Sequence, residues 1–277
     1  MTADRRLTPF NGRVAHVSLR ATVAAETYVE GTKAQITAPL AEICATPAGP
    51  RDRQLLLGAA VLVLERRNDW AFVQAEADGY CGWVPGNALG VAQVATHWVA
   101  APASHLYPEP SIKARELAAL PLNARVTITG ADGRFLQTAA GAFIPAQHLR
   151  AIGDWAKDPA DVAASLLGTP YLWGGNSRAG IDCSGLVQAA YTACGLPCPA
   201  DSDLQRGSLG APLPEGAPYR RGDLFFWKGH VALALDPETL IHANAYSMNV
   251  AREPIAASIR RIDAQGEGLP LCVKRRN

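Results

Sequence analysis

The feature that most restricts the fold of this chain is a weak internal repeat in its first half. Each copy places short runs rich in aliphatic and aromatic residues between Gly, Asp and Asn turn signals. The runs lie at 56–64, 69–74 and 79–85 in the first copy and at 120–128, 134–137 and 141–145 in the second. Short β-rich runs at this spacing are typical of a small all-β barrel of about 60 residues. The repeat therefore predicts two successive β modules.

From about residue 152 the pattern changes. Asp158 and Pro159 have the residue types preferred at the N-cap and the first position of a helix. A loop rich in Gly, Pro and Asn follows at 168–180, then a helix that ends near Gly195, then strand-like runs at 224–227, 230–235 and 240–243. Helices followed by antiparallel strands predict an α+β domain. The predicted domains are 1–92, which includes an N-terminal extension, 93–151 and 152–277. Whether residues 14–28 form strand or helix stays open.

Composition and charge exclude several classes of protein. The chain is 48% hydrophobic and 18% charged, which suits a folded core. The charges of its 26 basic and 25 acidic residues nearly cancel, so no net positive charge directs the chain to nucleic acid or to an anionic membrane. No apolar run reaches the roughly 18 residues of a membrane span, and no apolar segment follows the basic residues near the N-terminus. We therefore expect a cytoplasmic protein.

Six cysteines occur, and one of them stands out. Without an export signal we expect free thiols rather than disulfides, and no zinc-like spacing is present. Cys183, however, is at the start of the predicted second helix. The free N–H groups there favour a thiolate, so its pKa should fall from about 8.5. The same N–H groups suit an oxyanion. By itself, a cysteine before a helix is more often a buried apolar residue.

A thiol nucleophile needs an imidazole, and the imidazole needs a group that orients it. His230 and His242 both fall in predicted strands after Cys183. Strand side chains alternate, so a three- or five-residue loop would place them on one face and a four-residue loop on opposite faces. If aligned, His230 would be the base and His242 its partner.

Four motifs now carry a specific resemblance: Gly168-Thr-Pro-Tyr-Leu-Trp-Gly-Gly175, Gly180-Ile-Asp-Cys-Ser-Gly-Leu-Val-Gln188, Arg221-Gly-Asp-Leu-Phe-Phe-Trp227 with Gly229-His230, and Ile241-His-Ala243. In this order and spacing they resemble the NlpC family of papain-like cysteine peptidases, and the two modules resemble the SH3-like barrels of its dipeptidyl-peptidase VI branch. The implied fold is multidomain, with two small all-β SH3-like barrels before an α+β papain-like catalytic domain. The implied activity is hydrolysis of the bond between γ-D-glutamate and a diamino acid, usually meso-diaminopimelate, in small murein peptides taken up for recycling.

The resemblance also implies roles for individual residues. Cys183 would be the nucleophile, His230 the general base and acid, and His242 the third member. Tyr80, Tyr171, Asp182, Ser184 and Ser202 would contact an L-Ala-γ-D-Glu-diaminopimelate substrate, Asp182 and Ser184 at its free amine. Asp182 and Ser184 could instead cap the helix, and Tyr80 could be core, as we expect for Trp83. An acidic residue of the first module that meets the amine is not assigned, with Glu42 and Asp78 as candidates.

The expected chemistry is thiol hydrolysis without metal or organic cofactor. Two alternatives stay open. A papain-like acyltransferase would pass the acyl group to an amine or a lipid, and an inert protein would only bind cell wall through its SH3-like modules. A fold alone does not decide between them.

Overall fold

Short β strands build the first unit of the chain. The computed structural model describes residues 4–276, so residues 1–3 of the predicted first domain and residue 277 of the predicted third lie outside the described part. The described residues divide into two compact units, with the division between Ile152 and Gly153. The predicted division at 92/93 lies inside the first unit and stays a prediction.

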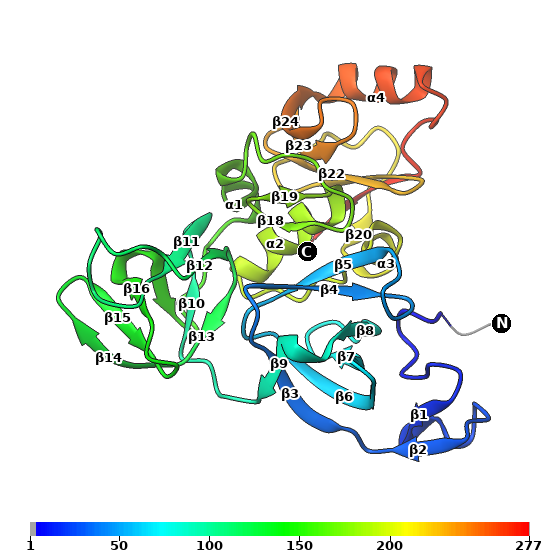
Figure 1. Cartoon of the computed structure of the whole chain (residues 1–277). Coiled ribbons are helices and arrows are strands. Elements are labelled where there is room, and N and C mark those ends of the chain that lie inside the picture. The colour runs from blue at the N-terminus through cyan, green and yellow to red at the C-terminus, as the bar shows by residue number, and fades with distance from the viewer. Residues whose placement is uncertain (1–3, 277) are drawn as a thin grey trace. The chain divides into compact units, whose positions relative to one another are not determined.

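The first copy of the repeat forms one antiparallel sheet with the strand order β5-β4-β8-β7-β6-β3-β9 (Figure 1). The strands are β3 (Thr32–Ile36), β4 (Leu40–Cys44), β5 (Arg51–Leu56), β6 (Ala60–Arg67), β7 (Trp70–Ala75), β8 (Cys81–Pro85) and β9 (Leu89–Val91). Leu64, Phe72 and Trp83 form an apolar cluster, and the Phe72 and Trp83 ring centroids are 5.5 Å apart. Trp83 is thus a core residue, as expected.

The N-terminal extension packs on this sheet through strands, not a helix. β1 (Val14–His16) pairs in parallel with β2 (Thr27–Val29), with a 3₁₀ turn at Val17–Leu19 between them. The backbone N–H of Cys81 donates to the carbonyl oxygen of Arg6 at 2.6 Å. Asn11 donates to Glu65 of β6 at 2.6 Å. These contacts tie the extension to β6 and to the start of β8.

The second copy of the repeat reproduces part of this pattern in three smaller sheets, β13-β10-β17, β11-β12 and β14-β15-β16. The strands are β10 (His97–Val99), β11 (Ala103–Leu106), β12 (Ala118–Pro121), β13 (Arg125–Val126), β14 (Ile128–Asp132), β15 (Phe135–Thr138), β16 (Phe143–Pro145) and β17 (Leu149–Ala151). In both copies a three-stranded meander ends at a proline, a 3₁₀ turn follows (Gly86–Ala88 and Ala146–His148), and a short strand begins at Leu89 or Leu149. The repeat is therefore structural. That the second copy closes as a barrel stays a prediction.

The turn at Leu57 and Gly58 joins the two copies within the first unit. Leu57 packs against the core of the second copy, and its carbonyl oxygen accepts a hydrogen bond from the Arg125 N–H at 2.8 Å. Gly58 has φ +77°, and a Cβ there would overlap the backbone of Arg125. Only glycine meets both demands without strain.

The second unit is α+β, as the sequence predicts. Its helices are α1 (Pro159–Ser165), α2 (Cys183–Ala193), α3 (Ser202–Ser208) and α4 (Ile255–Ala264). Its main sheet has the antiparallel order β20-β25-β21-β22-β23-β24. The strands are β20 (Ala211–Pro212), β21 (Leu224–Trp227), β22 (His230–Ala234), β23 (Thr239–Asn244), β24 (Asn249–Pro254) and β25 (Cys272–Arg275), beside a small pair, β18 (Asn176–Ser177) and β19 (Gly180–Ile181).

Helices meet this sheet through two different sets of side chains. α2 packs against β22 and β23. Phe225, Ala232 and Leu240, which share one face by strand pairing, pack instead with Ile255 and Ile262 of α4. The sequence predicts α1 with its cap, since Asp158 accepts from the Ala160 N–H at 2.8 Å. It predicts neither α3 nor α4.

Candidate active site

The nucleophile predicted from the sequence is the first residue of α2. Glycines let the preceding loop pack tightly on this helix start. A Cβ on Gly185 would lie 2.5 Å from the Gly175 carbonyl oxygen, and one on Gly175 would lie 2.5 Å from that of Gly180. Both motifs that flank Cys183 therefore need glycine for close backbone approach. This packing leaves the Cys183 side chain only 7% exposed.

Asp182 fastens the helix start to this loop. Its carboxylate accepts from the backbone N–H of Gly185 at 2.7 Å, from that of Gly174 at 2.8 Å and from the Ser184 hydroxyl at 3.1 Å. Asp182 is thus the N-cap of α2, which is one of the two roles that its position allows. Ser184 serves this cap as a donor. Contact of either residue with a substrate amine stays a prediction.

The environment of Cys183 corrects the expected thiolate. Burial first, and then the charge of Asp182, raises the pKa of Cys183 to about 12. The backbone N–H groups of Val231 in β22 and of Ser184 and Cys183 at the helix start act in the opposite direction, but they do not outweigh burial. The resting nucleophile is therefore a thiol. Its Sγ lies 3.9 Å from the carbonyl oxygen of Gly229, immediately before β22.

This protonation state has a measurable consequence. Because only the thiolate reacts, iodoacetamide should modify Cys183 slowly at pH 7, and the rate should rise roughly tenfold per pH unit up to pH 10. Peptide mapping by mass spectrometry would follow Cys183 separately from the other five cysteines. A rate that is already at its plateau below pH 7 would instead show a resting thiolate–imidazolium pair.

Asp182→Asn tests both the cap and the charge. The asparagine amide group cannot accept from Gly174, so we expect a loss of about 1–2 kcal/mol in the free energy of unfolding, measured by urea denaturation. Removal of the negative charge should also lower the pKa of Cys183 and speed its alkylation at pH 8. Unchanged stability together with unchanged alkylation would contradict this description of Asp182.

The two candidate histidines lie on the same face of the sheet. Leu233 pairs with Ile241 and Ala234 with Leu240, and the N–H of Leu235 bonds to the carbonyl oxygen of Thr239. The loop enclosed by this last hydrogen-bonded pair therefore has three residues, 236–238. This is one of the loop lengths for which both histidines are expected on one face. Nε2 of His230 lies 2.9 Å from Nδ1 of His242.

His230 is held neutral by its surroundings. Burial first, and then the neighbouring His242 and the positive Arg261, lowers the pKa of His230 to about 3, against a smaller opposing effect of Glu253. A neutral imidazole at pH 7 can accept a proton from the Cys183 thiol. The pair thus begins as neutral thiol and neutral base.

Two residues that the sequence analysis missed extend this arrangement. Nε2 of His242 lies 3.3 Å from Oε1 of Glu253, the residue before the last one of β24. Arg261 of α4 donates to both oxygens of Glu253, at 2.9 and 2.8 Å. The pairing of β23 with β24 would have revealed Glu253. Leu240 pairs with Glu253, and Leu240 and His242 are two residues apart in one strand, so Glu253 and His242 lie on the same face of the sheet. That register cannot be read without knowing the turn at 245–248.

Tyr171 is placed next to this group by its backbone. It bridges to Ile181, and its N–H donates to the carbonyl oxygen of Met248 at 2.8 Å. Burial first, and then the neighbouring Cys183 and Asp182 groups, raises the pKa of Tyr171 to about 12. Its hydroxyl therefore stays protonated and can donate a hydrogen bond.

The other predicted contact residues have clear positions but untested roles. Ser202 is the buried first residue of α3. Tyr80 is 2% exposed in the first unit, with the Arg53 guanidinium 5.2 Å from its ring centroid. Of the two acidic candidates, Glu42 pairs with Arg51 and Asp78 with Arg53. The substrate contacts of Tyr80 and Ser202 stay predictions.

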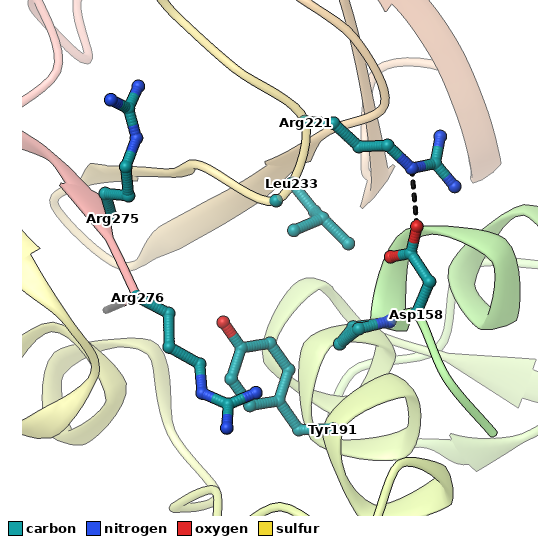
Figure 2. Close-up of a pocket in the computed structure, with 8 residues that line it drawn as sticks. Asp158, Tyr191, Arg221, Leu233, Arg275 and Arg276 are labelled. Carbon is teal, nitrogen blue, oxygen red and sulfur yellow. Dashed lines mark hydrogen bonds and ion pairs between the residues drawn. The ribbon is translucent and has the colours of Figure 1, made fainter.

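A cavity of about 240 Å³ in the second unit is separate from these residues (Figure 2). Its lining includes Asp158, Tyr191, Arg221, Leu233, Arg275 and Arg276. Arg221 pairs with Asp158 and Asp161, and Arg275 pairs with Asp223, so two of the three lining arginines are matched by carboxylates. Neither Cys183 nor the two histidines line this cavity.

Comparison with known proteins supports the fold and identifies the family. Residues 43–89 match the family described as bacterial dipeptidyl-peptidase Sh3 domain, and residues 168–261 match the NlpC/P60 family. Gamma-D-glutamyl-L-lysine dipeptidyl-peptidase of Bacillus subtilis is 30% identical over 220 residues, which cover 69% of this chain and 71% of that protein. The enzyme of the same name from Bacillus cereus is 28% identical over 243 residues, covering 76% and 72%.

A solved structure supports the fold. The NlpC/P60 family protein from Bacillus cereus superposes with a TM-score of 0.73 at 23% identity, covering 88% of this chain and 99% of that one. The chain belongs to the NlpC/P60 family of cysteine peptidases, with a preceding SH3 domain of the dipeptidyl-peptidase type. It is therefore a hydrolase, as the sequence analysis expects. No helix in residues 4–276 is long and apolar enough to cross a membrane.

Proposed function

We propose that this protein hydrolyses the γ-D-glutamyl–diamino acid bond of small murein peptides, with Cys183 as nucleophile and His230 as general base and acid. The observation that supports this most is the pair of aligned histidines on β22 and β23, beside a buried thiol. The Cys183 thiol contacts the carbonyl oxygen of Gly229, the residue that precedes β22. The two relatives named above are called gamma-D-glutamyl-L-lysine dipeptidyl-peptidases, which supports this substrate class.

The reaction follows from the protonation states. His230 takes the thiol proton as sulfur attacks the γ-carbonyl carbon, because both groups are neutral at rest. The backbone N–H of Cys183, at the free end of α2, and the protonated Tyr171 hydroxyl can donate to the oxyanion. His230 then gives its proton to the leaving amine, and water, activated by the same imidazole, cleaves the thioester. None of these steps requires a metal or an organic cofactor.

Substrate selection is the second part of the proposal. A free N-terminal L-Ala would bind near Asp182 and Ser184, with Tyr80 and Ser202 as further contacts. A carboxylate is a good partner for an ammonium. The raised pKa of Asp182 reflects burial, and an ammonium beside it would favour its charged form. The place of action, which we expect to be the cytoplasm, and the recycling role are predictions of the same kind.

Products in ¹⁸O-labelled water test hydrolysis against acyl transfer. Purified protein would be incubated with L-Ala-γ-D-Glu-meso-diaminopimelate, with its L-lysine counterpart and with N-acetylated forms of both. We expect L-Ala-D-Glu that carries one ¹⁸O atom, and we expect it from free-amine peptides only. Equal cleavage of acetylated peptides would overturn the amine contact. Turnover that requires an added amine acceptor and leaves no ¹⁸O in the acyl product would favour an acyltransferase.

A further inference from the structure

A continuous line of side chains runs from His230 to the surface of the second unit. His230 Nε2 faces His242 Nδ1 at 2.9 Å, and His242 Nε2 faces Glu253 Oε1 at 3.3 Å. Glu253 is in turn held by Arg261 of α4 and by the Ser258 hydroxyl, which donates at 3.0 Å. Arg261 itself stacks on the ring of Tyr246, 4.3 Å from its centroid. Each member is therefore fixed by the next.

The charge state of Glu253 decides where the protons on this line are. Hydrogen bonding to His242 is the main cause that lowers the pKa of Glu253 to about 2, so its carboxylate is ionised at neutral pH and can only accept. His242 must then carry its proton on Nε2. A neutral His242 has a lone pair on Nδ1, so His230 must donate from its own Nε2. The lone pair of His230 is consequently on Nδ1.

We propose that Glu253, clamped by Arg261, is a positioning residue that fixes the tautomers of His242 and His230 and so leaves Nδ1 of His230 able to take the Cys183 proton. The proposal rests on His230 acting as the base in the proposed function. Only one proton moves: from Sγ of Cys183 to Nδ1 of His230 as the C–S bond forms, and from there to the leaving nitrogen as the C–N bond breaks. Glu253 stays ionised throughout.

Arg261 has its own part in this arrangement. Its guanidinium donates to both oxygens of Glu253 and offsets part of the negative charge there, and its remaining nitrogen donates to Gln265 at 3.1 Å. Glu253 therefore acts on His242 mainly as a hydrogen-bond acceptor.

The competing explanation is a purely structural ion pair that ties β24 to α4. Glu253→Gln separates the two, because the Gln amide keeps the shape but can present an N–H to His242. Nε2 of His242 would then accept from this amide, so the proton of His242 would be on its Nδ1. His230 would have to accept at its own Nε2, and its proton would be on Nδ1, which could then no longer take a proton from Cys183. The matched control is Glu238→Gln, which removes the same charge from an exposed side chain between β22 and β23.

The test is a ¹⁵N NMR spectrum of the histidine rings of the full chain, with His230→Gln and His242→Gln used for assignment. We expect wild type and Glu238→Gln to show protonated Nε2 on both rings. Glu253→Gln should show Nδ1 protonation on His230 and a kcat at least tenfold lower with an unchanged KM. Unchanged tautomers in Glu253→Gln, or unchanged kcat despite altered tautomers, would overturn the proposal.

These spectra are recorded without substrate. A wild-type protein that cleaves none of the peptides would therefore defeat the proposed function, while the tautomers would still decide the role of Glu253. A fall in the unfolding temperature of Glu253→Gln with wild-type tautomers would establish the structural ion pair and reject the positioning role.

Discussion

Cys183→Ala is expected to abolish peptide hydrolysis, with kcat/KM falling by about 10⁴-fold or more. The physical reason is that no other described thiol lies at the N-terminus of α2 facing the start of β22. Loss of one buried sulfur should lower the free energy of unfolding by only about 1 kcal/mol, so the fold should persist. The measurement is steady-state cleavage of the tripeptide, with circular dichroism to check folding.

Cys194→Ala is the matched control for this substitution. Cys194 is the C-cap at the other end of the same helix, and it is partly exposed. We expect this variant to keep wild-type activity. Residual turnover in Cys183→Ala, or a comparable loss in Cys194→Ala, would remove Cys183 from the role of nucleophile.

His230→Gln should lower kcat by roughly 10²- to 10⁴-fold, the usual contribution of a general base. Because the thiol is neutral at rest, the same substitution should leave the alkylation rate of Cys183 at pH 7 nearly unchanged. The two readouts together separate a base that acts during turnover from one that ionises the thiol beforehand. An alkylation rate that falls in parallel with kcat would contradict the neutral pair.

The control for His230→Gln is His105→Gln, an exposed histidine of β11 in the first unit. We expect it to change neither kcat nor alkylation. A loss of activity in this variant would mean that substitutions of histidine disturb the protein in general.

The sequence predicts the candidate residues of the site because local chemistry and a family resemblance both point to them. A cysteine in a Gly-rich turn before an apolar helix, followed by two histidines in strand-like runs, makes Cys183, His230 and His242 candidates, and the resemblance to the NlpC family assigns their roles. The cap at Asp158 and the core position of Trp83 follow from residue type in the same way. These features depend on a few neighbouring residues, so one sequence suffices.

The features that the sequence did not predict depend on distant residues. The pKa of Cys183 is set by burial, which results from packing of the whole second unit, and this outweighs the local effect of the helix end. Glu253 and Arg261 become partners only when β24 pairs with β23 and α4 folds back against it. Residues 252–254 alone read Arg-Glu-Pro and do not indicate a strand that pairs with β23.

Mass spectrometry of L-Ala-γ-D-Glu-meso-diaminopimelate after incubation with wild-type protein, and in parallel with Cys183→Ala, tests the central claim most directly. We predict release of L-Ala-D-Glu and diaminopimelate by the wild type and no release by the variant. An intact tripeptide after incubation with wild type, or the same products from Cys183→Ala, would contradict the assignment of this protein as a γ-D-glutamyl–diamino acid peptidase that acts through Cys183.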